Sequence, residues 1–301
     1  MADTIAVAVP RKGRPLEAVL QRVAERAGAT DVAESIISTL RYEKSITKGA
    51  TDDPRDVYER LADYSDLSRP HRPEFTLLRD DRDGVPRRIV FDSVTIDAGD
   101  HRLQLVGREE PFRALRTHSF ALGFDSADLV LEEVVALRPD PLDTIADVNA
   151  RIDPHDTDVR VVTGLGDTVY HTLMATPQVL DSYRADGATR SFLAAYEGDL
   201  CISPRYERLV EAVLGTDVTE GIEFAYPDEG REEEAAIADT GVGVYLTMTG
   251  STARDHGLEL GTRLFPSETV LMENVAESTD SSEAAKGLFA DADLETELAV
   301  R

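Results

Sequence analysis

The sharpest chemical signal in the sequence is a turn of four small residues, Thr249, Gly250, Ser251 and Thr252. The turn follows the apolar segment 241–248, which we expect to be a strand, and it precedes a predicted helix. Backbone N–H groups in such a turn, together with the positive end of a helix, can hold an anion without lysine. The functional interpretation is a phosphate site, and the alternative is that Ser251 or Thr252 only caps the helix.

A second candidate is a group of three cations, Arg11, Lys12 and Arg14, around Gly13. These residues follow the first predicted strand, residues 5–9, and ligands of open α/β sheets bind beyond the carboxyl ends of strands. Three positive charges within four residues could hold a pyrophosphate or a triphosphate. The alternative is a solvated turn whose cations neutralise nearby carboxylates.

Other segments give weaker signals. Residues 122–128 end a predicted strand and begin a helix. One interpretation is that a side chain in this turn caps the helix, and the alternative is that the turn forms one wall of a cleft between lobes. Residues 163–167, TGLGD, lack the third glycine and the following helix of a dinucleotide-binding turn. Tyr170 and His171 lie in a predicted strand and are interpreted as packing or cleft-wall residues. The histidines show no metal-ligand spacing, and a serine nucleophile elbow and a lysine-bearing phosphate loop are both absent from the sequence.

The chain of 301 residues that carries these segments is strongly acidic. It contains 58 acidic and 32 basic side chains, which leave a formal charge of -26. This charge disfavours binding to nucleic acid. A lysine-poor, tryptophan-free composition of this kind is typical of proteins from a salt-saturated, halophilic cytoplasm, where cations screen self-repulsion. A single cysteine, the lack of an export signal and the lack of a long apolar run predict a cytoplasmic protein without membrane contact.

Strand and helix signals alternate along the chain, which predicts an α/β fold with largely parallel sheets. The first strand precedes an amphipathic helix at residues 15–27, and a hairpin is expected from residues 88–96 and 102–106. The other predicted strands are residues 119–123, 159–163, 170–175, 199–202, 222–225, 241–248 and 269–273. The other predicted helices are residues 31–41, 56–64, 128–137, 204–214, 232–237, 251–256 and 282–298.

In chain order, these pieces resemble the catalytic region of ATP phosphoribosyltransferase, the first enzyme of histidine biosynthesis. That family opens with a V-P-N-K-G-R-L-like turn, and residues 9–14 here read VPRKGR. A hairpin, a short helix and a D-L-G-I-T-G-x-D element follow in the family, and residues 121–128 here read ALGFDSAD. The family hallmark is an A-D-A-I-V-D-L-V-x-T-G-x-T-L-R strand and loop followed by N-G-L. Here Ala238 and Asp239 lead to TGSTAR at residues 249–254 and then to HGL.

The resemblance covers most of residues 1–275 outside a charged insertion at about 29–86, and we expect the family's C-terminal regulatory domain to be missing. It implies two α/β lobes of the periplasmic-binding-protein-like type with a cleft between them. The expected division of the chain is lobe I from residues 1–165, completed by 268–301, and lobe II from residues 166–267, which carries the phosphate loop.

The sequence also departs from the family pattern. Two extra residues lie between Asp239 and Thr249, and counting back from the loop puts Tyr245 where the family has the aspartate that serves the ribose. Ala121 replaces another aspartate, and the glycine and glutamate segment is only partly kept, at residues 230–233. We expect Asp239 to take over the contact to the ribose or to Mg²⁺ if the extra residues form a bulge.

The resemblance implies transfer of a phosphoribosyl group from phosphoribosyl pyrophosphate to ATP or a related purine acceptor, with Mg²⁺ on the pyrophosphate that is released. Residues 249–252 would seat the 5′-phosphate, and Arg11, Lys12 and Arg14 would meet the pyrophosphate or the nucleotide. The alternative function is a non-catalytic paralogue that binds a phosphorylated ligand between its lobes and regulates a partner. Whether the chain forms a homo-oligomer stays open.

Overall fold

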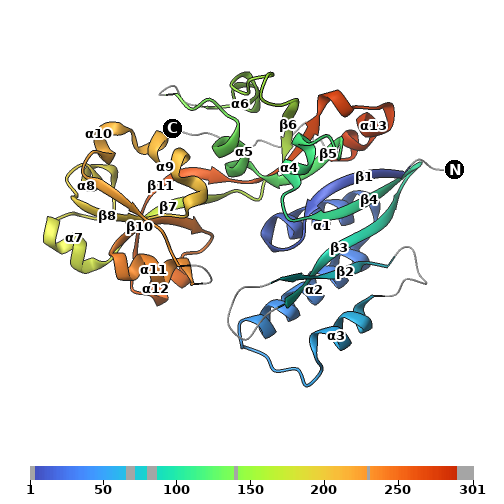
Figure 1. Cartoon of the computed structure of the whole chain (residues 1–301), viewed down its shortest axis with the longest axis horizontal. Helices are drawn as coiled ribbons and strands as arrows, with labels where there is room; N and C mark the ends of the chain where they lie inside the picture. The colour runs from blue at the N-terminus through green and yellow to red at the C-terminus, as the bar shows by residue number, and fades with distance from the viewer. Residues whose placement is uncertain (1–3, 66–71, 80–86, 139–141, 229–230, 290–301) are drawn as a thin grey trace. The chain divides into compact units, whose positions relative to one another are not determined.

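Two β-sheets organise the chain, one in each of two structural units (Figure 1). The computed structural model describes residues 4–65, 72–79, 87–138, 142–228 and 231–289. Among the described residues, the first unit comprises the chain from 4 to 126, residues 154–167 and residues 269–289, and the second comprises residues 127–153 and 168–268. The prediction of two α/β lobes is confirmed. Residues 127–153, which the sequence assigned to lobe I, are part of the second unit.

The first unit contains a mixed sheet whose strands lie in the order β2-β3-β4-β1-β5-β12-β6. Their bounds are β2 Glu74–Arg79, β3 Arg87–Ala98, β4 His101–Arg108, β1 Thr4–Pro10, β5 Leu122–Ser126, β12 Thr269–Asn274 and β6 Val159–Gly164. Only the pairings of β1 with β4 and with β5 are parallel in this sheet as described. The expectation of a largely parallel sheet is therefore wrong, because β2, β3 and β4 form a meander and β12 runs against both of its neighbours.

Helices of the first unit pack on this sheet. They are α1 Gly13–Ala27, α2 Thr30–Thr47, α3 Val57–Tyr64, α4 Pro111–Arg116 and α13 Asp280–Phe289, with a short 3-10 turn at Val275–Glu277. Of these helices, α1, α2, α3 and α13 share one core with the sheet. The predicted apolar face of α1 is buried, and α2 adds Ala33, Ile36 and Ile37 to the same core. Full burial of a valine, leucine or isoleucine side chain stabilises the fold by roughly 1.5 to 3 kcal/mol. The segment predicted as a charged insertion thus contributes to the core.

A buried ion pair joins α2 to α3. Arg60 donates from Nε to Glu43 Oε1 at 2.8 Å and from Nη2 to Oε2 at 3.1 Å, and the Tyr64 hydroxyl donates to Glu43 at 3.0 Å. Both charged side chains are almost fully buried. A bidentate pair in this setting fixes the two helices in one arrangement, because either charge alone would be costly to bury.

The second unit contains a sheet in the order β11-β7-β10-β8-β9. The strand bounds are β11 Glu259–Ser267, β7 Val169–Ala175, β10 Val242–Thr247, β8 Gly198–Cys201 and β9 Ile222–Ala225. The helices are α5 Ala127–Glu133, α6 Ile145–Ala150, α7 Pro177–Tyr183, α8 Arg190–Leu193, α9 Glu207–Leu214, α10 Thr216–Thr219, α11 Glu233–Thr240 and α12 Ser251–Asp255, with a 3-10 turn at Pro204–Tyr206. Here too the sheet is mixed, since β8 runs parallel to both β10 and β9 whereas β7 is antiparallel to both β10 and β11.

Most predicted elements are present near their predicted positions, including the hairpin of β3 and β4, which turns at Gly99 with φ +63°. The sequence missed β2, β11, the helices α6 to α8 and α10. Strand β11 was missed because Gly261 and Pro266 interrupt it, and proline is tolerated there because β11 is an edge strand. The final predicted helix is observed to Phe289, and its remainder lies outside the described residues. Among the described helices, none combines the length and apolarity that a membrane span requires.

Candidate functional site

The predicted phosphate turn connects β10 to α12 in the second unit. Gly250 is the N-cap of α12 with φ +68°, and no side chain caps the helix. The alternative that Ser251 or Thr252 is the cap is therefore wrong. A Cβ atom at position 250 would lie 2.2 Å from Cδ1 of Leu260, and the left-handed backbone is itself unfavourable for other residues. Both the backbone angle and the close approach of Leu260 favour glycine here.

Contacts within the turn hold its backbone in place. Arg254 Nη2 donates to the Thr249 carbonyl at 2.9 Å, and the hydroxyls of Thr249 and Ser251 are 3.1 Å apart. The Ser251 N–H is 3.4 Å from Thr249 Oγ1, a weak contact. The Thr252 hydroxyl has no hydrogen-bond partner among the residues that the structure describes. The turn thus keeps donor groups that a bound anion can use.

A cavity of about 340 Å³ opens beside this turn, entirely within the second unit. Thr249 and Gly250 line it, whereas Ser251 and Thr252 do not. The remaining lining residues come mainly from β7, β10 and β11 and are Thr168, Val169, Tyr170, Thr172, Thr247, Met248, Leu260, Gly261 and Arg263. Hydroxyl groups predominate among the polar side chains, and the lining contains no carboxylate. This composition suits an anionic or hydroxylated ligand.

The sequence did not single out Thr172, Thr247 and Arg263 as site residues. The hydroxyls of Thr172 and Thr247 are 2.7 Å apart across the β7–β10 pair, and the Arg263 guanidinium lies 4.8 Å from the ring centre of Tyr170. The alternation of Tyr170 and Thr172 along β7, which puts both on one face, is a signal that was available. No comparable signal existed for Arg263, because its strand was not predicted.

The opposite face of β7 carries a buried polar pair. His171 Nε2 and Asp128 Oδ2 are 2.8 Å apart, with side chains only 3% and 2% exposed, and Phe265 of β11 stacks on the His171 ring. Burial acts to raise the pKa of Asp128, but the hydrogen bond and charge of His171 outweigh it, so this pKa lies below its ordinary value. His171 is therefore a packing residue, as its strand position predicted, and the pair fixes β7 behind the cavity.

The predicted cationic turn lies in the first unit. Lys12 is the N-cap of α1, followed by Gly13 with φ +83°. Arg11 is 3.5 Å from Asp92 and Lys12 is 3.6 Å from Glu109, so both neutralise carboxylates while Lys12 remains 41% exposed. Lys12 is therefore the most solvent-exposed of the three cations in this turn.

Arg14 is occupied differently from its two neighbours. Its guanidinium donates to the Asp167 backbone carbonyl at 2.8 Å and to the Asp167 carboxylate, and its side chain is only 16% exposed. Asp167 also accepts from the backbone N–H and hydroxyl of Thr269, at 2.8 and 2.7 Å. Arg14 thus ties α1 to the ends of β6 and β12, which is a structural role.

The positions that depart from the family pattern lack a carboxylate aimed at the cavity. Asp239 lies in the last turn of α11, 71% exposed and paired with Arg231. Strand β10 pairs with β7 without a register shift, so the two extra residues form no bulge in that pairing. Tyr245 is half-buried in β10. Burial and, to a smaller extent, the negative charges of Glu233 and Glu234 raise its pKa, so its phenol is neutral.

Ala121 precedes β5 in the first unit, where its carbonyl accepts from the Asn274 N–H at 2.9 Å. It supplies only backbone groups at a position where the family pattern has a carboxylate. Residues 230–233 fall partly outside the described residues, so the first of them is not placed.

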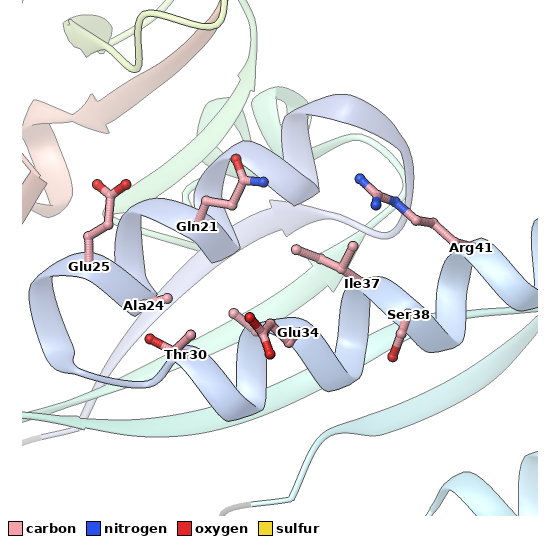
Figure 2. A pocket seen from close by; sticks show the side chains of 9 residues that line it. Gln21, Ala24, Glu25, Thr30, Glu34, Ile37, Ser38 and Arg41 are labelled. Atoms are coloured by element: carbon pink, nitrogen blue, oxygen red, sulfur yellow. The ribbon is translucent and has the colours of Figure 1, made fainter.

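A larger concavity, about 680 Å³, lies between α1 and α2 in the first unit and holds none of the predicted site residues. Figure 2 shows Gln21 and Glu25 projecting from α1 and Glu34, Ile37 and Arg41 from α2. Ala24, Ala33 and Ile37 form its apolar floor, and Arg41 pairs with Glu17 at 2.6 Å. Its residues form no nucleophile–base pair, so the smaller, hydroxyl-lined cavity of the second unit is the better candidate site.

Comparison with known proteins identifies a family. The family model described as halobacterial ATP phosphoribosyltransferase matches residues 1–300. A search of curated proteins returned no match.

Three solved structures match the chain at low sequence identity. The ATP phosphoribosyl transferase (HisG:HisZ) complex from Thermotoga maritima has a TM-score of 0.43 and 14% identity, covering 94% of each chain. A glycine betaine/carnitine/choline ABC transporter structure has a TM-score of 0.39 and 9% identity, covering 96% of this chain and 86% of that one. The C-terminal domains of a LysR family protein from Agrobacterium tumefaciens have a TM-score of 0.34 and 12% identity, covering 95% and 92%. These similarities say nothing about activity.

Proposed function

Because the chain belongs to the halobacterial ATP phosphoribosyltransferase family, we propose that it transfers a phosphoribosyl group from phosphoribosyl pyrophosphate to ATP or a related purine nucleotide. The observation that carries this proposal is the glycine turn between β10 and α12. It keeps the family's phosphate-loop sequence, adopts a left-handed backbone at Gly250 and borders a cavity without carboxylates. A turn with unused donor groups beside a cavity without carboxylates supports anion binding in a chain whose net charge is -26.

In this proposal the turn holds the 5′-phosphate of the sugar. The backbone N–H groups after Gly250 and the hydroxyl of Thr252 donate to phosphate oxygens, and Arg254 keeps the turn in position by its bond to the Thr249 carbonyl. A fixed phosphate anchors the ribose, so the binding energy of this remote group orients the anomeric carbon for attack.

Transfer requires no covalent protein nucleophile. A purine nitrogen forms a bond to the anomeric carbon as the bond to pyrophosphate breaks, through an oxocarbenium-like transition state, and the electron pair leaves with the pyrophosphate. The protein's contribution is to align both substrates and to stabilise the leaving anion. Lys12 is the accessible cation that we assign to pyrophosphate or nucleotide phosphates, in competition with Glu109.

Mg²⁺ fits this reaction as a cation carried by the pyrophosphate, whose charge it neutralises. The described residues contain no group of three or more histidine, cysteine or acidic side chains that could hold a metal ion. The metal would therefore be held mainly by substrate oxygens and water, with Asp239 free to approach only if it leaves Arg231. We further propose a cytoplasmic, high-salt setting, in line with the acidic composition.

Release of pyrophosphate tests the proposal. Purified protein in molar KCl with Mg²⁺ and phosphoribosyl pyrophosphate is given ATP or one of a panel of purine and pyrimidine nucleotides and bases. The proposal predicts acceptor-dependent release with a purine nucleotide. If none of the acceptors in the panel causes release of pyrophosphate, the transferase proposal is refuted. Tight substrate binding without turnover would instead support a non-catalytic paralogue.

A further inference from the structure

Arg263 occupies an unusual place in the cavity of the second unit. It is the one charged residue among those that line the cavity, and its side chain is exposed. Among the described residues it forms no ion pair, although acidic side chains outnumber basic ones by 58 to 32 in the chain. Its guanidinium lies instead over the ring of Tyr170. An arginine whose charge stays available beside hydroxyl groups is suited to bind an anion.

The fold turns Arg263 toward the cavity by irregular strand pairing. Arg263 pairs with Thr172, and Phe265 pairs with His171, so two steps along β11 correspond to one along β7. A second register shift separates Arg263 from Leu260. In a regular strand Arg263 and Phe265 would share a face, but the extra residue between them puts them on opposite faces.

The contacts on each face agree with this register. Phe265 stacks on His171 on the face away from the cavity, with ring centres 4.4 Å apart, whereas the Arg263 guanidinium lies over the Tyr170 ring at the cavity. Bulges of this type re-aim side chains beside binding sites. The neighbouring Gly261 permits the arrangement, because a Cβ atom there would lie 1.8 Å from the Ala188 carbonyl oxygen.

The chemistry of the cavity favours a phosphate monoester over other anions. Its volume of about 340 Å³ exceeds that of an inorganic ion and falls at the lower end of the range for ligand pockets, roughly 300 to 1,000 Å³. A guanidinium can donate two parallel hydrogen bonds to phosphate oxygens, and the hydroxyls of Thr172 and Thr247 can accept from sugar hydroxyls. The cation–π contact with Tyr170 limits the positions that the guanidinium can take before binding, which reduces the entropy lost on binding.

We propose that Arg263 is the specificity-determining residue that binds the phosphate monoester of a pentose phosphate in the cavity of the second unit, which Thr249 and Gly250 of the turn also line. This inference rests on the proposed function and assigns to β11 a contact that the loop motif alone does not provide. The loop supplies neutral donors, and Arg263 supplies the matching charge.

Calorimetric titration with ribose 5-phosphate, ribose and inorganic phosphate tests the proposal in the full chain at high salt. We expect R263Q to raise the Kd of ribose 5-phosphate by about tenfold to one-hundredfold, the effect of losing a charged hydrogen bond. R263K should lose less, since it keeps the charge without the fork. R205Q is the matched control, because Arg205 is an exposed arginine of the same unit outside the cavity, and it should bind like the wild type.

A second measurement uses the wild-type protein, so it does not depend on a variant folding. Phenylglyoxal modifies exposed arginines, and mass spectrometry maps the products. Ribose 5-phosphate should protect Arg263 and leave Arg205 reactive. Equal reactivity of Arg263 with and without the ligand would overturn the proposal.

The outcomes separate this inference from the proposed function. Equal affinity of wild type and R263Q for ribose 5-phosphate, in a protein that releases pyrophosphate, would overturn the role of Arg263 and leave the transferase intact. Phosphate binding that depends on Arg263 without any pyrophosphate release would support the anion site and refute the transferase. A wild-type protein that binds none of the phosphate probes would refute both.

Discussion

Replacing Gly250 with alanine tests whether the geometry of the turn, rather than its sequence alone, creates the site. Gly250 and Gly257 flank α12 with nearly the same backbone angle, φ +68° and +72°. An added Cβ atom meets Cδ1 of Leu260 at 2.2 Å in the first case and finds nothing within 4 Å in the second. Gly257→Ala is thus a matched control that carries the backbone cost without the contact.

The magnitudes follow from these two terms. A left-handed backbone costs an alanine roughly 1 to 2 kcal/mol, which both variants share. Overpacking against Leu260 adds roughly 1 to 3 kcal/mol to Gly250→Ala alone. Leu260 is 38% exposed, so it can move partly aside, and the lower half of that range is the expected value.

Chemical unfolding in molar KCl measures the difference, with signals assigned to the second unit because two units need not unfold together. Gly250→Ala should be less stable than Gly257→Ala and should lose affinity for ribose 5-phosphate, which Gly257→Ala should keep. Adding Leu260→Ala should restore part of the stability of Gly250→Ala. Equal destabilisation by the two glycine replacements would refute the reasoning from the Leu260 contact.

Three further predictions follow from single contacts. Thr252→Val should weaken phosphate-dependent binding by about 1 to 3 kcal/mol in calorimetry, since the anion loses a donor, and unchanged binding would make the hydroxyl irrelevant. Arg60→Ala should destabilise the first unit by about 3 to 5 kcal/mol in denaturant unfolding, whereas replacing Arg60 and Glu43 together by apolar residues should cost much less; equal losses would argue against a buried pair. The pKa of Asp128 is lowered in the folded state, so its stabilisation is complete above the unfolded value near 3.9 and is lost as pH falls below that value. Asp128→Asn should therefore flatten the acid limb of the melting temperature against pH, and an unchanged limb would contradict the assignment.

The sequence predicted the parts of the fold that depend on local pattern. The apolar stripe of α1, the hairpin at Gly99 and the turn at Gly250 were all found because periodicity and turn residues specify them directly. The direction of the strands was not found, because alternation of helix and strand does not reveal that β12 pairs antiparallel with β5 and β6.

The same limit applies to the candidate site. The phosphate turn is contiguous in sequence and was therefore visible, whereas Arg263 reaches the cavity through two register shifts in an edge strand. Arg14 was predicted to bind a ligand, but it is bonded to Asp167, which lies more than 150 residues away in the sequence. Nothing in the sequence of the cationic turn indicates this partner. Long-range pairings of this kind are decided by tertiary structure.

Phosphorus NMR of phosphoribosyl pyrophosphate bound to the protein tests the central assignment most directly, because the 5′-phosphate and the pyrophosphate give separate signals. With wild type and Gly257→Ala, the 5′-phosphate signal should shift on binding, and with Gly250→Ala that shift should be lost. A 5′-phosphate signal that stays unshifted while the wild-type protein binds the substrate would contradict the assignment of the 249–252 turn as its seat.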